Sequence, residues 1–211
     1  MTDMGAFRES VTAWAAGGPG DRARELAARL SVRTVVLLEG PSDLAAVDAL
    51  AASRGRDLEA EGVCVLAMNG AMSVGRFARL LGPLGLGLRL TGLCDEAERG
   101  YYARALEQDG SSQGNTAGRQ EFFVCAADLE DELIRALGVS RVEELVRAEG
   151  DLRALRTFVR QPAQHGRSSQ RQLRRFLGTK KGRKIHYGRV LVEALSPDHV
   201  PAPLDDLLAA V

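Results

Sequence analysis

Short apolar segments alternate with amphipathic segments through the first two thirds of the chain. Four of the apolar segments are continuous runs, the pattern of strands buried on both faces of a parallel sheet. They lie at 35–38, 63–68, 88–94 and 122–125. Apolar residues at helical spacing follow each run. This alternation predicts an α/β fold, a central parallel sheet of about four strands flanked by helices.

The segments before and between these strands carry simpler signals. Helical spacing predicts two N-terminal helices, at 5–16 and 21–30, with a Gly-Gly-Pro-Gly break between them. Ser42 is the predicted N-cap of the helix that follows the first strand. The polar, Gly/Ser-rich stretch at 109–118 is predicted to be a mobile loop.

Beyond about residue 140 the pattern is helical throughout, which separates this region from the alternating part of the chain. Breaks occur at Pro162 and at Ser196-Pro197. We therefore predict three parts: a helical N-terminal segment, an α/β domain and a helical C-terminal extension. They cover residues 1–31, 32–138 and 139–211.

Composition places the chain among soluble globular proteins. Hydrophobic residues make up 45% and charged residues 27%. No apolar run approaches the ~20 residues that span a bilayer, and the N-terminus lacks the pattern of a secretory signal. The three cysteines, Cys64, Cys94 and Cys125, are far apart and form no CxxC pair. These features predict a cytoplasmic protein with reduced thiols and no membrane partner.

The formal net charge of zero conceals two oppositely charged regions. Between Asp151 and Arg189 there are twelve basic residues and one acid, a net charge of +11. The rest of the chain carries −11. Such an asymmetry indicates an anionic partner for the basic region.

Acidic residues follow three of the four predicted strands. Because ligands bind outside the carboxyl ends of parallel strands, we expect these side chains to converge at one edge of the sheet. Converging carboxylates repel one another unless a cation lies between them, and Mg²⁺ or Mn²⁺ prefers such oxygen ligands. The acids are Glu39 and Asp43, then Asp95, Glu96 and Glu98, then Asp128, Glu130, Asp131 and Glu132.

A second interpretation applies to most of these acids individually. Acids in the first turn of a helix interact favourably with the helix dipole, without any metal. Asp43, Glu98 and the acids after the fourth strand fit that role equally well. Glu39 and Asp95 favour the metal site most, because each directly follows an apolar strand.

Two segments carry a resemblance to a known family. Val-Val-Leu-Leu-Glu-Gly-Pro-Ser-Asp at 35–43 and Leu-Thr-Gly-Leu-Cys-Asp at 90–95 resemble the TOPRIM domain of the OLD (overcoming lysogenisation defect) endonucleases. The similarity extends from about residue 32 to residue 195. It implies a TOPRIM-like, Rossmann-like sheet and a hydrolase that cleaves nucleic acid with one or two Mg²⁺ or Mn²⁺ ions.

The resemblance also implies a set of metal ligands. Glu39 would bind metal and act in catalysis, Asp43 would join the first ion, and Asp95 would lie between two ions. Glu130 matches the late acidic ligand of the family. The family usually has Asp-x-Asp after the third strand, whereas here Glu98 stands three residues after Asp95 and would have to reach the second ion.

The family further implies a catalytic lysine in the C-terminal helices, which would complete the active site. Lys184 matches the lysine that stabilises the pentavalent phosphate, and Lys181 is its rival. OLD proteins usually carry an ATPase domain, but no G-x-x-x-x-G-K-[ST] motif occurs in this chain. The chain is therefore expected to be a standalone catalytic module that works with a separate ATPase.

Basic residues of the C-terminal region are predicted to bind nucleic-acid phosphates, with DNA favoured over RNA. The alternative is a solvated helical face, or a surface that neutralises the acidic part of the same chain or of a second subunit in a homodimer. The predicted contacts are Arg167, Arg171, Arg174, Arg175, Lys180, Lys181 and Arg183.

The sequence thus predicts a metal-dependent endonuclease, with two alternatives left open. One is another TOPRIM chemistry, nucleotidyl transfer. The other is a nucleic-acid-binding or regulatory subunit whose Asp-x-x-Glu site no longer supports two metal ions.

Overall fold

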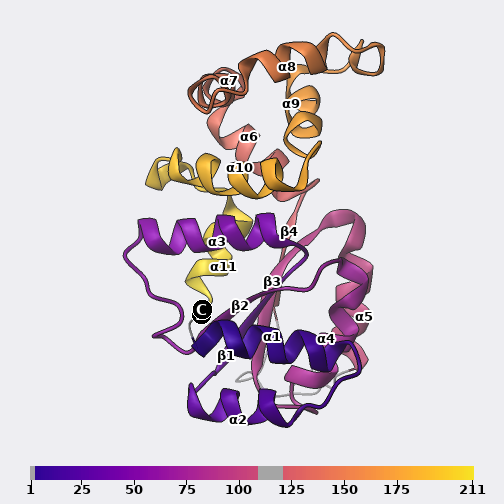
Figure 1. The fold of residues 1–211 in the computed structure, drawn as a ribbon, viewed down its shortest axis with the longest axis vertical. Helices are drawn as coiled ribbons and strands as arrows, with labels where there is room; N and C mark the ends of the chain where they lie inside the picture. Colours follow the sequence, from indigo (N-terminus) through magenta and orange to yellow (C-terminus); the bar gives the residue numbers. More distant parts are fainter. Residues whose placement is uncertain (1–2, 109–120) are drawn as a thin grey trace.

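A computed structural model describes residues 3–108 and 121–211, except the side chains of 106–108 and Lys181. The predicted mobile loop at 109–118 lies outside the described residues. The architecture is an α/β sheet whose C-terminal helices extend beyond one edge (Figure 1).

The central sheet has four strands, all parallel, in the order β2-β1-β3-β4. The predicted fold class is confirmed, and the predicted strand ends differ from the observed ones by no more than one residue. The strands are β1 (Thr34–Leu38), β2 (Val63–Ala67), β3 (Arg89–Asp95) and β4 (Glu121–Cys125).

Two hydrophobic cores lie on opposite faces of the sheet, because successive strand side chains point to opposite sides. Val35 and Leu37 belong to one core, Val36 and Leu38 to the other. The first core is covered by α1 (Asp3–Ala15), α2 (Asp21–Arg29), α4 (Val74–Leu81) and α5 (Arg99–Gln108). The second is covered by α3 (Pro41–Ser53), α6 (Leu129–Leu137), α10 (Lys181–Glu193) and α11 (Ala202–Ala209).

The C-terminal helices extend the second core away from the sheet. Figure 1 shows α7 (Val139–Ala148), α8 (Leu152–Val159) and α9 (Ser169–Leu177) above α10, which runs along α3. The approach of α10 to α3 depends on Gly188, since a Cβ there would lie 2.6 Å from the backbone oxygen of Ser42. This contact places the basic region next to the carboxyl edge of the sheet.

Short 3-10 helices connect several of these elements. Two of them lie at the carboxyl edge of the sheet and two in the C-terminal region. They are η1 (Ala71–Ser73), η2 (Glu96–Glu98), η4 (Pro162–Gln164) and η5 (Pro197–His199).

The predicted N-cap of α3 is wrong. The helix begins at Pro41, so Gly40 is the N-cap and Ser42 lies within the first turn, buried. Proline is favoured at the first helical position because it has no N–H to leave unpaired. The glycine N-cap has no side chain to bond the first turn, but Asp43 at the third helical position accepts a hydrogen bond of 2.9 Å from the Gly40 N–H.

Candidate metal centre

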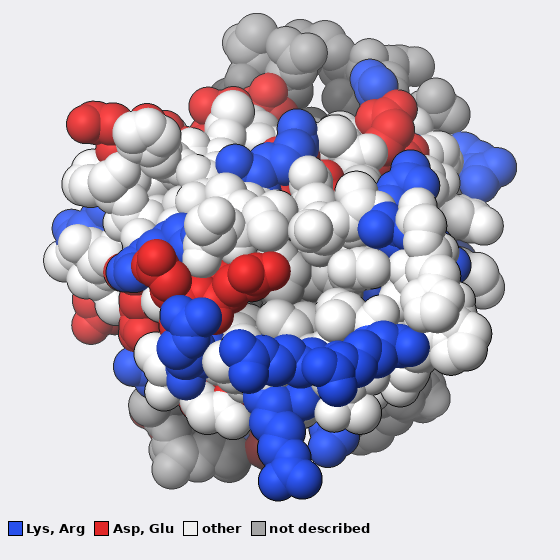
Figure 2. Space-filling view, turned by 90° about the horizontal axis from the view of Figure 1, so that it is seen from above, with Lys and Arg blue, Asp and Glu red and all other residues white. Residues whose placement is uncertain are grey.

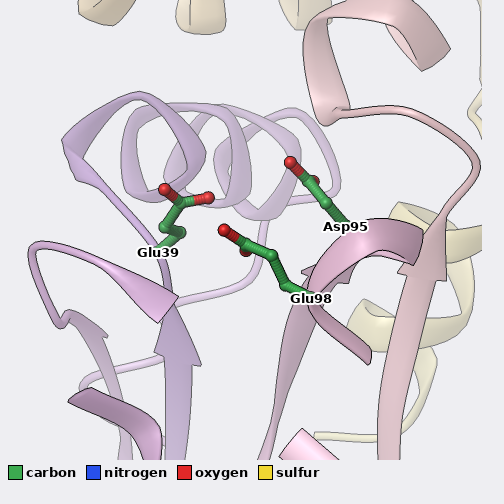
Figure 3. Close-up of side chains that lie close together, drawn as sticks. All are labelled: Glu39, Asp95 and Glu98. Atoms are coloured by element: carbon green, nitrogen blue, oxygen red, sulfur yellow. The ribbon is translucent and has the colours of Figure 1, made fainter. Parts of the chain in front are cut away.

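Three carboxylates converge at the carboxyl edge of the sheet. Glu39 directly follows β1, Asp95 is the last residue of β3, and Glu98 ends η2. One oxygen of each lies within 4.8 Å of the others. Figure 3 shows the three side chains pointing toward one another. The predicted convergence of strand-end acids is therefore observed for these three.

Backbone geometry holds these strand ends in place. β1 and β3 are neighbours, and Gly92 of β3 pairs with Leu37 of β1. A Cβ at Gly92 would lie 1.9 Å from the Leu37 oxygen, so only glycine permits this approach. After β2, the chain turns at Gly70 (φ 128°). The Gly70 N–H donates a 3.0 Å hydrogen bond to the backbone carbonyl oxygen of Glu39. The position of Glu39 is thus fixed from both sides.

The three carboxylates are half-buried and have no ion pair with any described Lys or Arg. Burial, followed by the charges of Asp128 and Glu39, raises the pKa of Asp95 to about 7. Burial and the charge of Glu39 also raise the pKa of Glu98. One oxygen of Glu98 is buried without a hydrogen-bond partner among the described residues. Such a set of hard oxygen ligands fits a divalent cation such as Mg²⁺ or Mn²⁺.

Two other predicted ligands lie nearby but have other partners. Asp43 bonds to the Gly40 N–H, and burial raises its pKa although the charge of Lys184 opposes the change. Glu130 in α6 is buried, and its Oε2 lies 3.3 Å from Nζ of Lys184. Burial raises the pKa of Glu130 to about 7. Among the described residues, neither acid belongs to the three-carboxylate cluster.

Asp128 belongs to the same neighbourhood, as expected of the acids after the fourth strand, although the ligand set that the resemblance implies leaves it out. Its Oδ1 accepts a 2.8 Å hydrogen bond from the Asp131 N–H and caps α6, while its Oδ2 lies 2.6 Å from Nε of Arg174. Its charge also acts on Asp95. The signal was its place shortly after β4, three residues beyond Cys125, whereas Glu39 directly follows β1 and Asp95 ends β3.

A hollow of about 730 Å³ opens beside these ion pairs, toward α9. Its lining includes four of the predicted nucleic-acid contacts together with the predicted catalytic lysine. They are Arg167, Arg171, Arg174, Arg175 and Lys184. Figure 2 shows this end of the molecule, where Lys and Arg side chains lie next to a group of acids.

The remaining predicted contacts lie elsewhere or have partners. Lys180 and Arg183 line a second hollow of about 560 Å³. Arg183 bonds to Asp151 at 3.1 Å and stacks over Phe176 with 4.1 Å between the guanidinium carbon and the ring centroid. The side chain of Lys181, the alternative catalytic lysine, is outside the described part of the chain. Lys184 lies with Nζ 3.3 Å from Oε2 of Glu130, and the choice between the two lysines stays a prediction.

The fold and the cluster define a class: an α/β domain with three converging carboxylates, able to hold a divalent cation, at the carboxyl ends of parallel strands. Residues 32–96 match the model of the TOPRIM domain of overcoming lysogenization defect protein-like proteins. Over these residues the chain is similar to OLD-like TOPRIM domains, as the resemblance implied. The resemblance was expected from residue 32 to about residue 195. The match covers the first part of this range, residues 32–96.

Solved structures extend the similarity of fold to the C-terminal helices. The C-terminal region of the Burkholderia pseudomallei OLD protein is 21% identical, with a TM-score of 0.62, over 84% of this chain and 96% of that one. The C-terminal region of the Xanthomonas campestris pv. campestris OLD protein is 24% identical, with a TM-score of 0.63, over 84% and 93%. No curated protein matches the chain. None of the described helices is long and apolar enough to cross a bilayer.

Proposed function

We propose that this chain is a metal-dependent nuclease that hydrolyses phosphodiester bonds of nucleic acids, DNA in preference to RNA. One observation carries the proposal: three carboxylates without a described ion-pair partner converge at the carboxyl edge of the sheet, and Asp128, whose charge acts on Asp95, lines a hollow together with arginines. The carboxylates can hold one or two divalent cations, and the hollow can hold the phosphates of a polyanion. The OLD-like TOPRIM domain supports the assignment to nucleic-acid processing.

In this proposal, Glu39, Asp95 and Glu98 are the metal ligands. A bound Mg²⁺ or Mn²⁺ would polarise the scissile phosphate and lower the pKa of the attacking water. Asp43 and Glu130 each use one carboxylate oxygen for their present bonds to Gly40 and Lys184, so they would join as ligands through the other oxygen. The raised pKa of Asp95 means that a bound cation would stabilise its ionised form.

The basic residues hold the substrate. Lys184 would donate a hydrogen bond from Nζ to a phosphate oxygen and neutralise charge that develops there. Its bond to Glu130 holds Nζ at the edge of the hollow. Arg171 and Arg175, with no ion pair among the described residues, would bind phosphates on either side of the scissile one.

We also propose the larger context that the resemblance implies. The three predicted parts, 1–31, 32–138 and 139–211, would act as one catalytic module in the cytoplasm. The module would work with a separate ATPase, and it would form a homodimer if a second copy covers the basic surface. Gel filtration with and without DNA, and cleavage assays with and without ATP and a candidate ATPase, test these points.

A regulatory DNA-binding subunit is the second candidate. The spacing Asp95-x-x-Glu98 favours it, because the longer arm of Glu98 replaces the aspartate usual at this place in TOPRIM domains. Nucleotidyl transfer by the same acids is the third. Incorporation of labelled nucleotides, instead of cleavage, would identify that chemistry.

The deciding experiment incubates the purified protein with supercoiled plasmid, linear DNA and RNA in Mg²⁺, Mn²⁺ or EDTA. We expect metal-dependent cleavage that is lost in Glu39→Ala and Asp95→Asn. Glu96→Gln is the matched control, since Glu96 is an exposed neighbour outside the cluster. DNA binding without cleavage in every metal would favour the regulatory subunit instead.

A further inference from the structure

Two buried polar atoms without hydrogen-bond partners belong to residues four apart in the chain, Glu98 of the three-carboxylate cluster and Tyr102. Among the described residues, three buried side-chain atoms have no hydrogen-bond partner: Glu98 Oε2, the Tyr102 hydroxyl and Gln164 Oε1. Gln164 belongs to η4 in the C-terminal region, away from the other two in the chain. Buried polar groups in folded proteins almost always have partners, so two unpaired groups on neighbouring turns of the chain need an explanation.

Tyr102 is fixed in position next to Glu98. It stands four residues after Glu98, at the start of α5, and side chains at this spacing lie on the same face of a helix. Its ring is buried and meets Phe122 edge-on, with 4.9 Å between the ring centroids. Burial, followed by the charges of Cys94 and Glu98, raises the pKa of Tyr102, so its hydroxyl stays protonated.

We propose that Tyr102 is a positioning residue of the metal centre, whose hydroxyl donates a hydrogen bond to the Glu98 carboxylate when this carboxylate binds a divalent cation. The inference rests on the proposed metal site. The chemistry is complementary: a protonated phenol is a donor, and an ionised carboxylate is an acceptor with several free lone pairs. Partners of this kind orient metal ligands and raise their affinity.

This role also explains how Glu98 can serve at an unusual spacing. Its side chain has one methylene more than an aspartate and therefore more rotamers to lose on binding a cation. A donor fixed on the next turn of the helix would hold the carboxylate in one orientation. Tyr102 would thus compensate for the replacement of Asp-x-Asp by Asp95-x-x-Glu98.

The test compares Tyr102→Phe with Tyr101→Phe. Phenylalanine keeps the buried ring of residue 102 and removes only the hydroxyl, and Tyr101 is the exposed neighbour on the same helix. Mn²⁺ affinity is measured by titration calorimetry and by electron paramagnetic resonance of free Mn²⁺. We expect Tyr102→Phe to weaken Mn²⁺ binding about 10-fold or more, and Tyr101→Phe to leave it unchanged.

Two readouts separate positioning from a structural role. In EDTA, Tyr102→Phe should unfold at the same temperature as the wild type or higher, because it removes an unpaired buried hydroxyl. In a Glu98→Ala background, Tyr102→Phe should have no further effect on Mn²⁺ affinity. A persistent effect in that background, or a loss of stability in EDTA that accounts for the weaker binding, overturns the proposal.

A measurement on the unmutated protein makes the test independent of folding of the variants. The chain has 3 tyrosines, so ¹³C labelling at tyrosine Cζ gives few signals. We expect Mg²⁺ to shift the Tyr102 signal and not the Tyr101 signal. If the wild type binds Mn²⁺ and Tyr102→Phe binds it equally well, this inference alone fails. If the wild type binds no Mn²⁺, the proposed function and the inference fail together.

Discussion

Two groups of acids lie at the same edge of the sheet and differ in their partners. Glu39, Asp95 and Glu98 follow β1 and β3 and have no described ion pair. Asp128 and Glu130 follow β4 and pair with cations of α9 and α10. The first group converges on itself, whereas the second joins the C-terminal helices to the sheet.

The difference shows that residue type and strand-end position do not by themselves decide the role of an acid. An acid with a protein cation nearby is neutralised within the chain. An acid cluster that forms no ion pair keeps an unfavourable repulsion between its carboxylates, and a bound cation relieves this repulsion. In our proposal the first group binds the metal and the second places Lys184, and the following predictions test this division.

The largest expected effect comes from the first group. Asp95→Asn removes a ligand charge and should lower the cleavage rate about 10³-fold, since metal catalysis contributes several kcal/mol. Single-turnover cleavage of labelled DNA measures it, with Glu96→Gln as the control. A rate within a few-fold of the wild type would place the metal elsewhere.

The next largest effect is expected from a variant that disturbs the packing of α10, which carries Lys184, against α3. In Gly188→Val the new side chain meets the Ser42 backbone, so α10 must move away from α3. We expect a loss of about 1–3 kcal/mol in the free energy of unfolding, measured with urea. Gly182→Ala in the same helix is the control. Apart from its chain neighbours and the backbone of its own helix, no described atom lies within 4 Å of the new Cβ.

The same variant also separates substrate placement from metal binding. Because Gly188→Val shifts the helix that carries Lys184, cleavage should fall while Mn²⁺ affinity stays within a few-fold of the wild type. An equal loss of Mn²⁺ affinity would mean that the helical region also supports the metal ligands.

A smaller effect concerns the basic hollow. The double change Arg171→Glu, Arg175→Glu should weaken DNA binding and reduce the slope of log K against log salt by about 2. Arg156→Glu, Arg160→Glu is the matched control, because these exposed arginines of the same basic region line neither hollow. Equal losses in both pairs would indicate a diffuse charge effect.

The smallest expected effect is on stability as pH changes. The pKa of Asp95 is about 7 in the folded protein and near 3.8 when unfolded, so the folded state holds its proton more tightly. In EDTA, its contribution to stability is full below about pH 4 and lost as pH rises through about 7. Thermal unfolding should show a decline over this range that Asp95→Asn reduces and Mg²⁺ reverses.

Much of the fold could be predicted because each strand is a local signal. The apolar runs and the helical spacing depend on neighbouring residues, and the strand ends were placed within one residue. The N-cap at Ser42 was wrong because Pro41 allows the helix to start earlier. The approach of α10 to α3 at Gly188 depends on residues far apart in the chain and left no local signal.

The site was predictable only in part for the same reason. Glu39 and Asp95 were recognised from their strand ends, and these do converge with Glu98. The pairing of Glu130 with Lys184 and of Asp128 with Arg174 depends on how α6 packs against α9 and α10. The unpaired Tyr102 hydroxyl became visible only when its burial was known.

The central claim is that the acids without ion pairs, Glu39, Asp95 and Glu98, hold the divalent cation. A crystal grown with Mn²⁺ and measured at the manganese absorption edge tests it most directly. We predict an anomalous peak within about 2.3 Å of an oxygen of each of these three residues. A peak bound only by Asp128 and Glu130, or none at this edge of the sheet, would contradict the claim.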